Sequence, residues 1–333
     1  RITEHSFVSE NVLINQVNNR IKNMPEWKKV QFKTKYFEVD ETFLSEALTF
    51  SKEDGVIYVY LKEVWEDEVF IQKTIKDLAN RPDIVFRTPV TIKYFEELLF
   101  DNESAISKKN KTEYSSAIKK QAEVCERVFN KSLCIISGAA GTGKTTIIKA
   151  LLSAIEKVHG TGSSVLSLAP TGKASQRIRE KTGKNASTIH SLLASKGWLN
   201  DNFTFKRSGG QKASEFSTVI IDECSMIDLS LMATLFRCVD WNKVERLLLV
   251  GDPNQLPPIG RGKVFSDIIG YIKDNFIASL GKLEINMRQM ENRISGKGTG
   301  ILRLADIYIQ EHQDNSAHSK SEKEEVLKKL QEG

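Results

Sequence analysis

A glycine-rich segment followed by a lysine and two hydroxyl residues carries the strongest chemical signal in the sequence. Residues 138–146 read Gly-Ala-Ala-Gly-Thr-Gly-Lys-Thr-Thr, which satisfies the pattern G-x-x-x-x-G-K-[ST]. The apolar run Leu133–Ile136 precedes the segment, and an apolar helical pattern over 147–152 follows it. Such glycines let backbone N–H groups surround phosphate oxygens, and the start of a helix adds partial positive charge. The segment therefore predicts a phosphate-binding loop.

Residues of this loop have distinct expected roles toward ATP and Mg²⁺. The Lys144 amine is expected to reach the β- and γ-phosphates, and the Thr145 hydroxyl is expected to ligate Mg²⁺. The predicted nucleotide-binding residues of the loop are Gly138, Gly141, Thr142, Gly143, Lys144, Thr145 and Thr146.

An acidic pair follows a second β-prone run, Thr218-Val-Ile-Ile. Asp222 and Glu223 would stand at the carboxyl end of that strand, where parallel α/β sheets place their ligands. Asp222 is expected to hold Mg²⁺, and Glu223 to orient and deprotonate the attacking water. An apolar run ending in Asp-Glu is also common at an ordinary strand-to-turn junction. The phosphate loop upstream favours the catalytic interpretation.

A third apolar run, Leu247–Val250, leads into Gly-Asp-Pro-Asn-Gln-Leu-Pro-Pro. A glutamine just past a strand end can contact the γ-phosphate, and Gln255 is predicted to do so. On spacing alone a proline-rich turn explains this segment better.

The elements that position these residues alternate between strands and helices from residue 116 onward. Apolar runs at 133–137, 165–168, 219–221 and 247–250 are separated by helical patterns near 143–158, 172–183 and 229–238. Short β-runs that alternate with helices predict an α/β fold, with a parallel sheet covered by helices on both faces.

The first hundred residues have a different pattern and predict a small N-terminal α+β accessory domain. A loose helical stripe precedes residue 22, Asp40 is a candidate helix cap, and 56–61 resembles a strand. A helix over 62–80 would place Ile71, Ile75 and Leu78 on one stripe. A winged-helix fold is compatible with this pattern but is not established by it. The polar segment 101–115 is expected to be a linker.

Composition narrows the class of protein. The chain has 333 residues, enough for about two domains, and no apolar run approaches the length that spans a bilayer. Its four cysteines form no C-x-x-C pair, so we expect reduced thiols in a cytoplasmic protein.

The net charge is +5, and residues 131–215 hold 13 basic and 4 acidic residues. This excess indicates a polyanionic partner such as nucleic acid, or a solvated basic surface.

Taken together, the motifs resemble the RecD-like branch of superfamily-1 helicases, the branch that moves 5′ to 3′ on single-stranded DNA. The resemblance runs from about 118 to 305. It is carried in order by Gln121 and by residues 138–146, 168–174, 187–193, 222–228, 251–262 and 283–289.

The resemblance implies a RecA-like P-loop motor domain over 116–280 and the start of a second motor domain, apparently incomplete, over 281–333. It implies that Gln121 recognises the adenine base. It also implies that Arg288 is an arginine finger, which reaches the γ-phosphate from the second domain. It assigns contacts with single-stranded DNA, or with a single-strand/double-strand junction, to Pro170, Thr171, Lys173, Thr188 and His190. For the aromatic and basic stretch 198–207 two interpretations stay open: it faces DNA, or it covers the sheet.

The family's later T-x-H-x-x-Q-G and A-L-T-R segments are absent after Arg288, so we expect the natural protein to be longer. The sequence thus predicts an ATP-dependent DNA helicase or translocase, or its first motor lobe. Two alternatives remain open: a nucleotide-gated DNA-binding subunit with little hydrolysis of its own, and an ATPase that remodels proteins. Protein partners are unknown.

Overall fold

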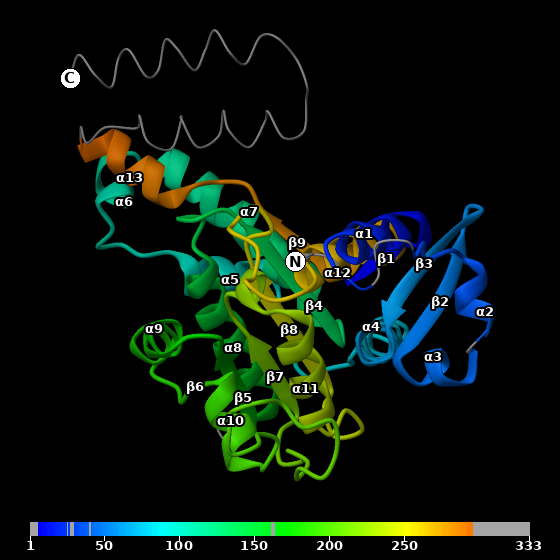
Figure 1. Cartoon of the computed structure of the whole chain (residues 1–333). Helices are drawn as coiled ribbons and strands as arrows, with labels where there is room; N and C mark the ends of the chain where they lie inside the picture. The colour runs from blue at the N-terminus through cyan, green and yellow to red at the C-terminus, as the bar shows by residue number, and fades with distance from the viewer. Residues whose placement is uncertain (1–5, 25, 27–29, 40, 161–163, 296–333) are drawn as a thin grey trace, which may run out of the picture.

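The computed structural model describes residues 6–24, 26, 30–39, 41–160 and 164–295 (Figure 1). A six-stranded sheet has the order β6-β5-β7-β8-β4-β9, and every pairing in it is parallel. Its strands are β4 (Leu133–Gly138), β5 (Val165–Ala169), β6 (Ser187–Thr188), β7 (Thr218–Ile221), β8 (Arg246–Gly251) and β9 (Leu280–Leu283). The predicted α/β fold with a parallel sheet is confirmed.

Helices cover both faces of this sheet because alternate residues of each buried strand point to opposite faces. In β4, Leu133 and Ile135 join one core cluster, whereas Cys134 and Ile136 join the other. The first cluster includes α10 (Ile189–Ser195), α11 (Leu229–Cys238) and α12 (Val264–Asn275). The second includes α5 (Ile92–Leu99), α6 (Ala105–Lys109), α7 (Lys111–Phe129) and α8 (Lys144–His159).

The N-terminal part contains a three-stranded antiparallel sheet of order β1-β3-β2. Its elements are β1 (Phe7–Ser9), α1 (Glu10–Lys22), α2 (Lys35–Val39), α3 (Glu41–Ala47), β2 (Leu48–Glu53) and β3 (Val56–Leu61). No residue of α1 is buried, so the helical stripe expected before residue 22 does not face a core. The candidate cap Asp40 lies outside the described residues.

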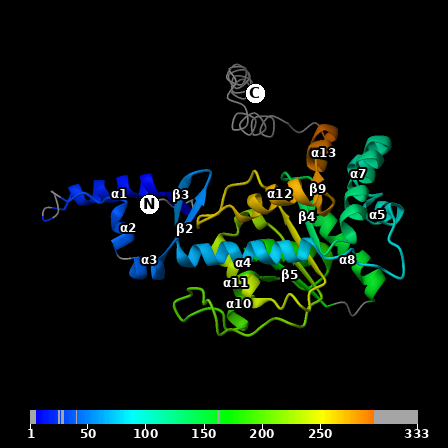
Figure 2. The ribbon, with the colours of Figure 1, turned by 90° about the vertical axis from the view of Figure 1, so that its right-hand side faces the viewer.

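The long helix α4 (Lys62–Ala79) joins the small sheet to the six-stranded sheet of the predicted motor domain, the motor sheet (Figure 2). Ile71, Ile75 and Leu78 lie on its buried face, as the sequence stripe predicts, and they belong to the core of the six-stranded sheet. The Asp67 carboxylate accepts a hydrogen bond from the Arg237 guanidinium of α11 and lies 3.0 Å from Arg207 Nη1. Residues of 62–99 therefore pack into the cores of the six-stranded sheet, so packing does not separate the accessory part from the predicted motor domain at residue 100.

The segment 101–115 is not an extended linker. It contains α6 and the first turn of α7, and Ile106 and Tyr114 are buried in the second core cluster. The linker prediction was wrong because the stretch is mostly polar, which is typical of an exposed segment. Its few apolar side chains nevertheless pack into the core.

Strand β9 belongs to the same sheet as β4 rather than to a second motor domain. Leu280 pairs with Ile135 and Leu283 with Gly138, in parallel register. The segment that follows is α13 (Met287–Ser295), and residues 296–333 lie outside the description. The prediction that a second domain starts at residue 281 is therefore wrong for residues 281–283, which belong to the six-stranded sheet.

All four cysteines are buried and unpaired. Burial raises the pKa of the Cys134 and Cys238 thiols to about 11, and it raises the pKa values of Cys125 and Cys224 as well. Within the described ranges, no helix is both long enough and apolar enough to cross a membrane.

Candidate functional site

The phosphate loop connects β4 to α8 and turns through two glycines in the left-handed region. Gly141 has φ +87° and Gly143 has φ +91°, values that residues with a Cβ rarely adopt. The Lys144 Nζ donates hydrogen bonds to the carbonyl oxygens of Gly138 at 2.8 Å and Ala139 at 3.1 Å. The amine thus lies against the loop, held by carbonyls that a phosphate can replace. Thr145 and Thr146 lie in the first turn of α8, and neither is buried.

Gln121 of α7 packs beneath the loop. The side chain is buried, and its Nε2 donates to the Thr142 carbonyl oxygen at 2.9 Å. The Thr142 hydroxyl donates in turn to the Ala139 carbonyl oxygen at 2.9 Å. A cavity of about 370 Å³ adjoins Gln121 between α7 and the residues of 282–285. The structure therefore brings Gln121 to the loop and to an adjoining cavity.

Two carboxylates lie just past the end of β7. Asp222 is buried, and burial raises the pKa of its carboxyl group to about 6, although nearby Lys144 and Arg177 oppose this shift. The Glu223 backbone N–H donates to Asp222 Oδ1 at 2.8 Å. Glu223 itself has φ +54°, an uncommon conformation for a residue other than glycine.

The two oxygens of the Glu223 carboxylate have different surroundings. Its Oε2 is buried without a hydrogen-bond partner among the described residues. Its Oε1 lies 3.5 Å from Arg177 Nη1, on α9 (Gly172–Thr182). Sequence reasoning did not place Arg177 beside an acidic residue, because α9 and β7 are far apart in the chain.

Gln255 follows β8 and connects two segments at the carboxyl edge of the sheet. Its Oε1 accepts a hydrogen bond from the Ser225 hydroxyl at 3.3 Å, and both residues line a small cavity of about 70 Å³. Ser225 stands two positions after Glu223, so Gln255 is held near the acidic pair.

The residues after β9 contact the phosphate loop directly. The Asn286 Nδ2 donates to the Ala140 carbonyl oxygen at 2.9 Å, and the Arg288 backbone N–H donates to the Gly141 carbonyl oxygen at 3.2 Å. A Cβ on Gly141 would lie only 2.7 Å from Asn286 Oδ1. The backbone of Arg288 thus contacts the phosphate loop directly. Its segment follows β9, a strand of the same sheet as β4, and does not come from a separate domain. Asn286 was not among the predicted site residues, and only its place within the resembling motif pointed to it.

The expected DNA-contact residues lie at or just past the ends of β5 and β6. The hydroxyls of Thr171 and Thr188 cap α9 and α10, accepting hydrogen bonds from the Ala174 and Ser191 backbone N–H groups. Lys173 and His190 are exposed, and Pro170 is half-buried. The two threonines therefore shape the turns, while Lys173 and His190 present side chains to solvent.

Two residues of the stretch 198–207 pack on the rest of the protein, whereas a third is exposed. Trp198 is buried in the core, and Arg207 pairs with Glu66 and Asp67 of α4. Phe203 at the tip of the hairpin-like loop is 79% exposed.

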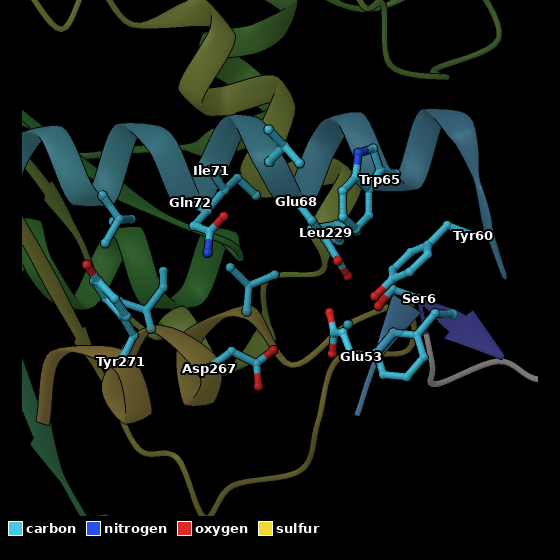
Figure 3. A pocket seen from close by; sticks show the side chains of 16 residues that line it. Ser6, Glu53, Tyr60, Trp65, Glu68, Ile71, Gln72, Leu229, Asp267 and Tyr271 are labelled. Atoms are coloured by element: carbon cyan, nitrogen blue, oxygen red, sulfur yellow. The ribbon is translucent and has the colours of Figure 1, made fainter. Parts of the chain in front are cut away.

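A larger cavity, about 480 Å³, lies away from the loop between α4, the N-terminal sheet and α12 (Figure 3). Three carboxylates point into it, those of Glu53, Glu68 and Asp267. Burial raises the pKa values of Glu68 and Asp267, and it raises the pKa of the neighbouring Tyr60 to about 12. The carboxylates of this cavity repel phosphate groups, so it does not suit a nucleotide.

Comparison with known proteins shows what this chain is similar to. The family model described as an AAA domain matches residues 121–261. An uncharacterised protein of Methanocaldococcus jannaschii is 34% identical over 244 residues, which cover 70% of this chain and 20% of that protein. The ATP-dependent RecD2 DNA helicase of Deinococcus radiodurans is 38% identical over 142 residues, 43% of this chain and 18% of that protein. A solved structure, the Pif1 helicase from Candida albicans, is 20% identical over 56% of this chain and 43% of its own, with a TM-score of 0.37.

The chain thus spans about a fifth of the length of these first two curated relatives. The resemblance drawn from the motifs is confirmed: the chain is similar to RecD-like superfamily-1 helicases, and residues 121–261 match the AAA-domain model.

Proposed function

We propose that this protein binds ATP with Mg²⁺ at the loop between β4 and α8 and hydrolyses it to drive movement along single-stranded DNA. The observation that carries the proposal is convergence at one edge of the sheet. Gln121 from α7 and Asn286 after β9 contact the loop 138–146, and Lys144 of the loop lies near Asp222 at the end of β7. Gln255, after β8, contacts Ser225 beside the acidic pair. The similarity to ATP-dependent DNA helicases supports the same reading.

The donor set fits a magnesium nucleotide. The Thr145 hydroxyl and the Asp222 carboxylate are oxygen ligands, which Mg²⁺ prefers, and Mg²⁺ commonly uses one or two carboxylates together with substrate phosphates. The described residues contain no cluster of three or more acidic, His or Cys side chains that could hold a metal unaided, so phosphate oxygens would complete the shell. Bound Mg²⁺ would neutralise phosphate charge and favour the ionised form of Asp222.

The remaining roles follow from position. Lys144 would exchange its two carbonyl partners for the β- and γ-phosphates. Glu223 would take a proton from water as the water oxygen bonds to the γ-phosphorus and the bond to the ADP oxygen breaks. Gln255 would contact the γ-phosphate and transmit its loss. Arg288 would supply positive charge from the first lobe.

On the DNA side, Thr171 and Thr188 would set the turns that present backbone N–H groups, with Lys173 and His190 contacting phosphates and bases. The substrate would be single-stranded DNA or a single-strand/double-strand junction, with 5′-to-3′ movement. A second motor lobe, beyond the described residues, would complete the working unit. A cytoplasmic location remains a prediction.

Steady-state ATPase, measured with and without a single-stranded oligonucleotide, tests the proposal. DNA should stimulate turnover, and Lys144→Ala should abolish it. Lys149→Ala is a matched control, because Lys149 is exposed on the same helix and lies beyond the loop. ATP and DNA binding without turnover would favour a nucleotide-gated DNA-binding subunit. Turnover indifferent to DNA would favour a protein-remodelling ATPase.

A further inference from the structure

An ion pair connects the expected DNA face to the expected hydrolytic carboxylate. Arg177 stands on α9, the helix that begins at the proposed DNA turn Pro170-Thr171. Its Nη1 lies 3.5 Å from Glu223 Oε1. Figure 1 shows α9 beside β6, at the edge of the motor sheet to which β7 also belongs.

Glu223 depends on this partner for charge compensation. Its other oxygen, Oε2, is buried and has no hydrogen-bond partner within the described part of the chain. Its side chain is 17% exposed. A mostly buried carboxylate is sensitive to the removal of a cationic contact, because little solvent replaces it.

Arg177 can exchange partners. Its side chain is 53% exposed, and it follows the exposed Lys173 by four residues, so the two side chains share a face of α9. A DNA strand that contacts Lys173 therefore passes close to the guanidinium. The same planar fork of N–H donors binds carboxylate and phosphate oxygens, and partly exposed ion pairs are weak.

We infer that Arg177 couples DNA contact on α9 to the state of Glu223, a regulation of the nucleotide site that rests on the function proposed above. Without DNA the guanidinium holds Glu223 Oε1 in an ion pair, so this oxygen is not available to a water molecule. A DNA phosphate takes the guanidinium, and the carboxylate is released to act as the base. Arg177 is thus a positioning residue that acts through Glu223.

A binding cycle without nucleotide tests the competition directly. The affinity of a labelled oligothymidylate is measured by fluorescence anisotropy at fixed salt for wild type, Arg177→Gln, Glu223→Gln and the double variant. Glu223→Gln should tighten DNA binding by about two- to fivefold, because Arg177 no longer has a charged competitor. In the Arg177→Gln background the same change should have no effect. Equal effects of Glu223→Gln in both backgrounds would overturn the inference.

Turnover provides the second readout. Arg177→Gln should raise ATPase in the absence of DNA and reduce the ratio of stimulated to basal rate, and Arg177→Lys should fall between it and wild type. Lys181→Gln removes the same charge from the same helix at a residue outside the Arg177–Glu223 ion pair, so its basal rate should match wild type. A fall in rate by the same factor with and without DNA would overturn the inference, since Arg177 would then support the active geometry.

The two proposals fail in different ways. If wild type shows neither DNA binding nor ATPase, the proposed function fails and the coupling falls with it. If wild type is stimulated by DNA but Arg177→Gln keeps the wild-type ratio, only the coupling is wrong. Circular dichroism of each variant verifies that the fold is retained.

Discussion

Asp67 offers a quantitative test of whether α4 is part of the motor core. Its carboxylate is 8% exposed and meets the Arg237 side chain, which is 14% exposed, and the more exposed Arg207. Asp67→Ala leaves Arg237 buried without its anionic partner. Breaking a buried pair in this way costs about 3–5 kcal/mol, since the remaining charge has lost both solvent and partner.

The neighbouring residue provides the control. Glu66 also pairs with Arg207, at 2.9 Å, but its side chain is 50% exposed. Solvent screening limits such a pair to about 0–1 kcal/mol, so Glu66→Ala should be nearly neutral. The two variants remove adjacent carboxylates from the same helix, and they differ mainly in burial.

Urea unfolding followed by circular dichroism measures both variants. A loss of about 3–5 kcal/mol for Asp67→Ala in a single transition would mean that α4 and the motor sheet unfold together. Replacing both partners, as Asp67→Leu with Arg237→Met, should recover part of the loss, because no buried charge is stranded. Losses below about 1 kcal/mol for both Asp67→Ala and Glu66→Ala would refute the docking of α4 on α11.

Three further predictions concern the strand, the base and the acidic cavity. Gly281→Ala should cost about 1–3 kcal/mol in urea unfolding, because its Cβ would lie 2.5 Å from Val124 Cγ1, whereas Gly270→Ala, with open space around it, should not destabilise. Glu223→Gln should retain ATP binding and slow hydrolysis about 10²- to 10⁴-fold; loss of nucleotide binding in equilibrium dialysis would instead indicate a structural role. Burial raises the pKa of Glu68 in the folded protein, so its ionised form opposes folding. The folded state is therefore favoured while Glu68 is protonated, and this stability is lost as pH rises through the raised pKa. Glu68→Gln should therefore be more stable than wild type at pH 8, with the difference vanishing as acidification protonates Glu68 in both states; a pH-independent difference in thermal unfolding would contradict this.

The sequence predicts the central elements well because their signals are local. The helical patterns near 143–158, 172–183 and 229–238 correspond to α8, α9 and α11 within about one residue at each end. Buried parallel strands are short apolar runs, and the phosphate-loop pattern specifies a strand, a turn and a helix in order. The positions of Lys144 and Asp222 at one edge of the sheet follow from that order.

What the sequence misses depends on contacts between distant segments. An amphipathic helix such as α4 shows which face is apolar, but not that this face packs on the motor sheet. Strand β9 has four residues, too few to reveal which sheet they join, and Arg288 was assigned to a second lobe through resemblance alone. The pairing of Arg177 with Glu223 depends on the packing of two elements far apart in the chain, which no residue pattern encodes.

The burial of every native thiol has a practical consequence for spectroscopy. Maleimides react with thiolates, and buried thiols with raised pKa values supply almost none at neutral pH. A cysteine introduced at Val85, which is 92% exposed, or at Phe203 would therefore carry a dye without removal of the other four. A donor and an acceptor at these two positions would report by energy transfer whether the tip of the 198–207 loop moves when nucleotide or DNA is added.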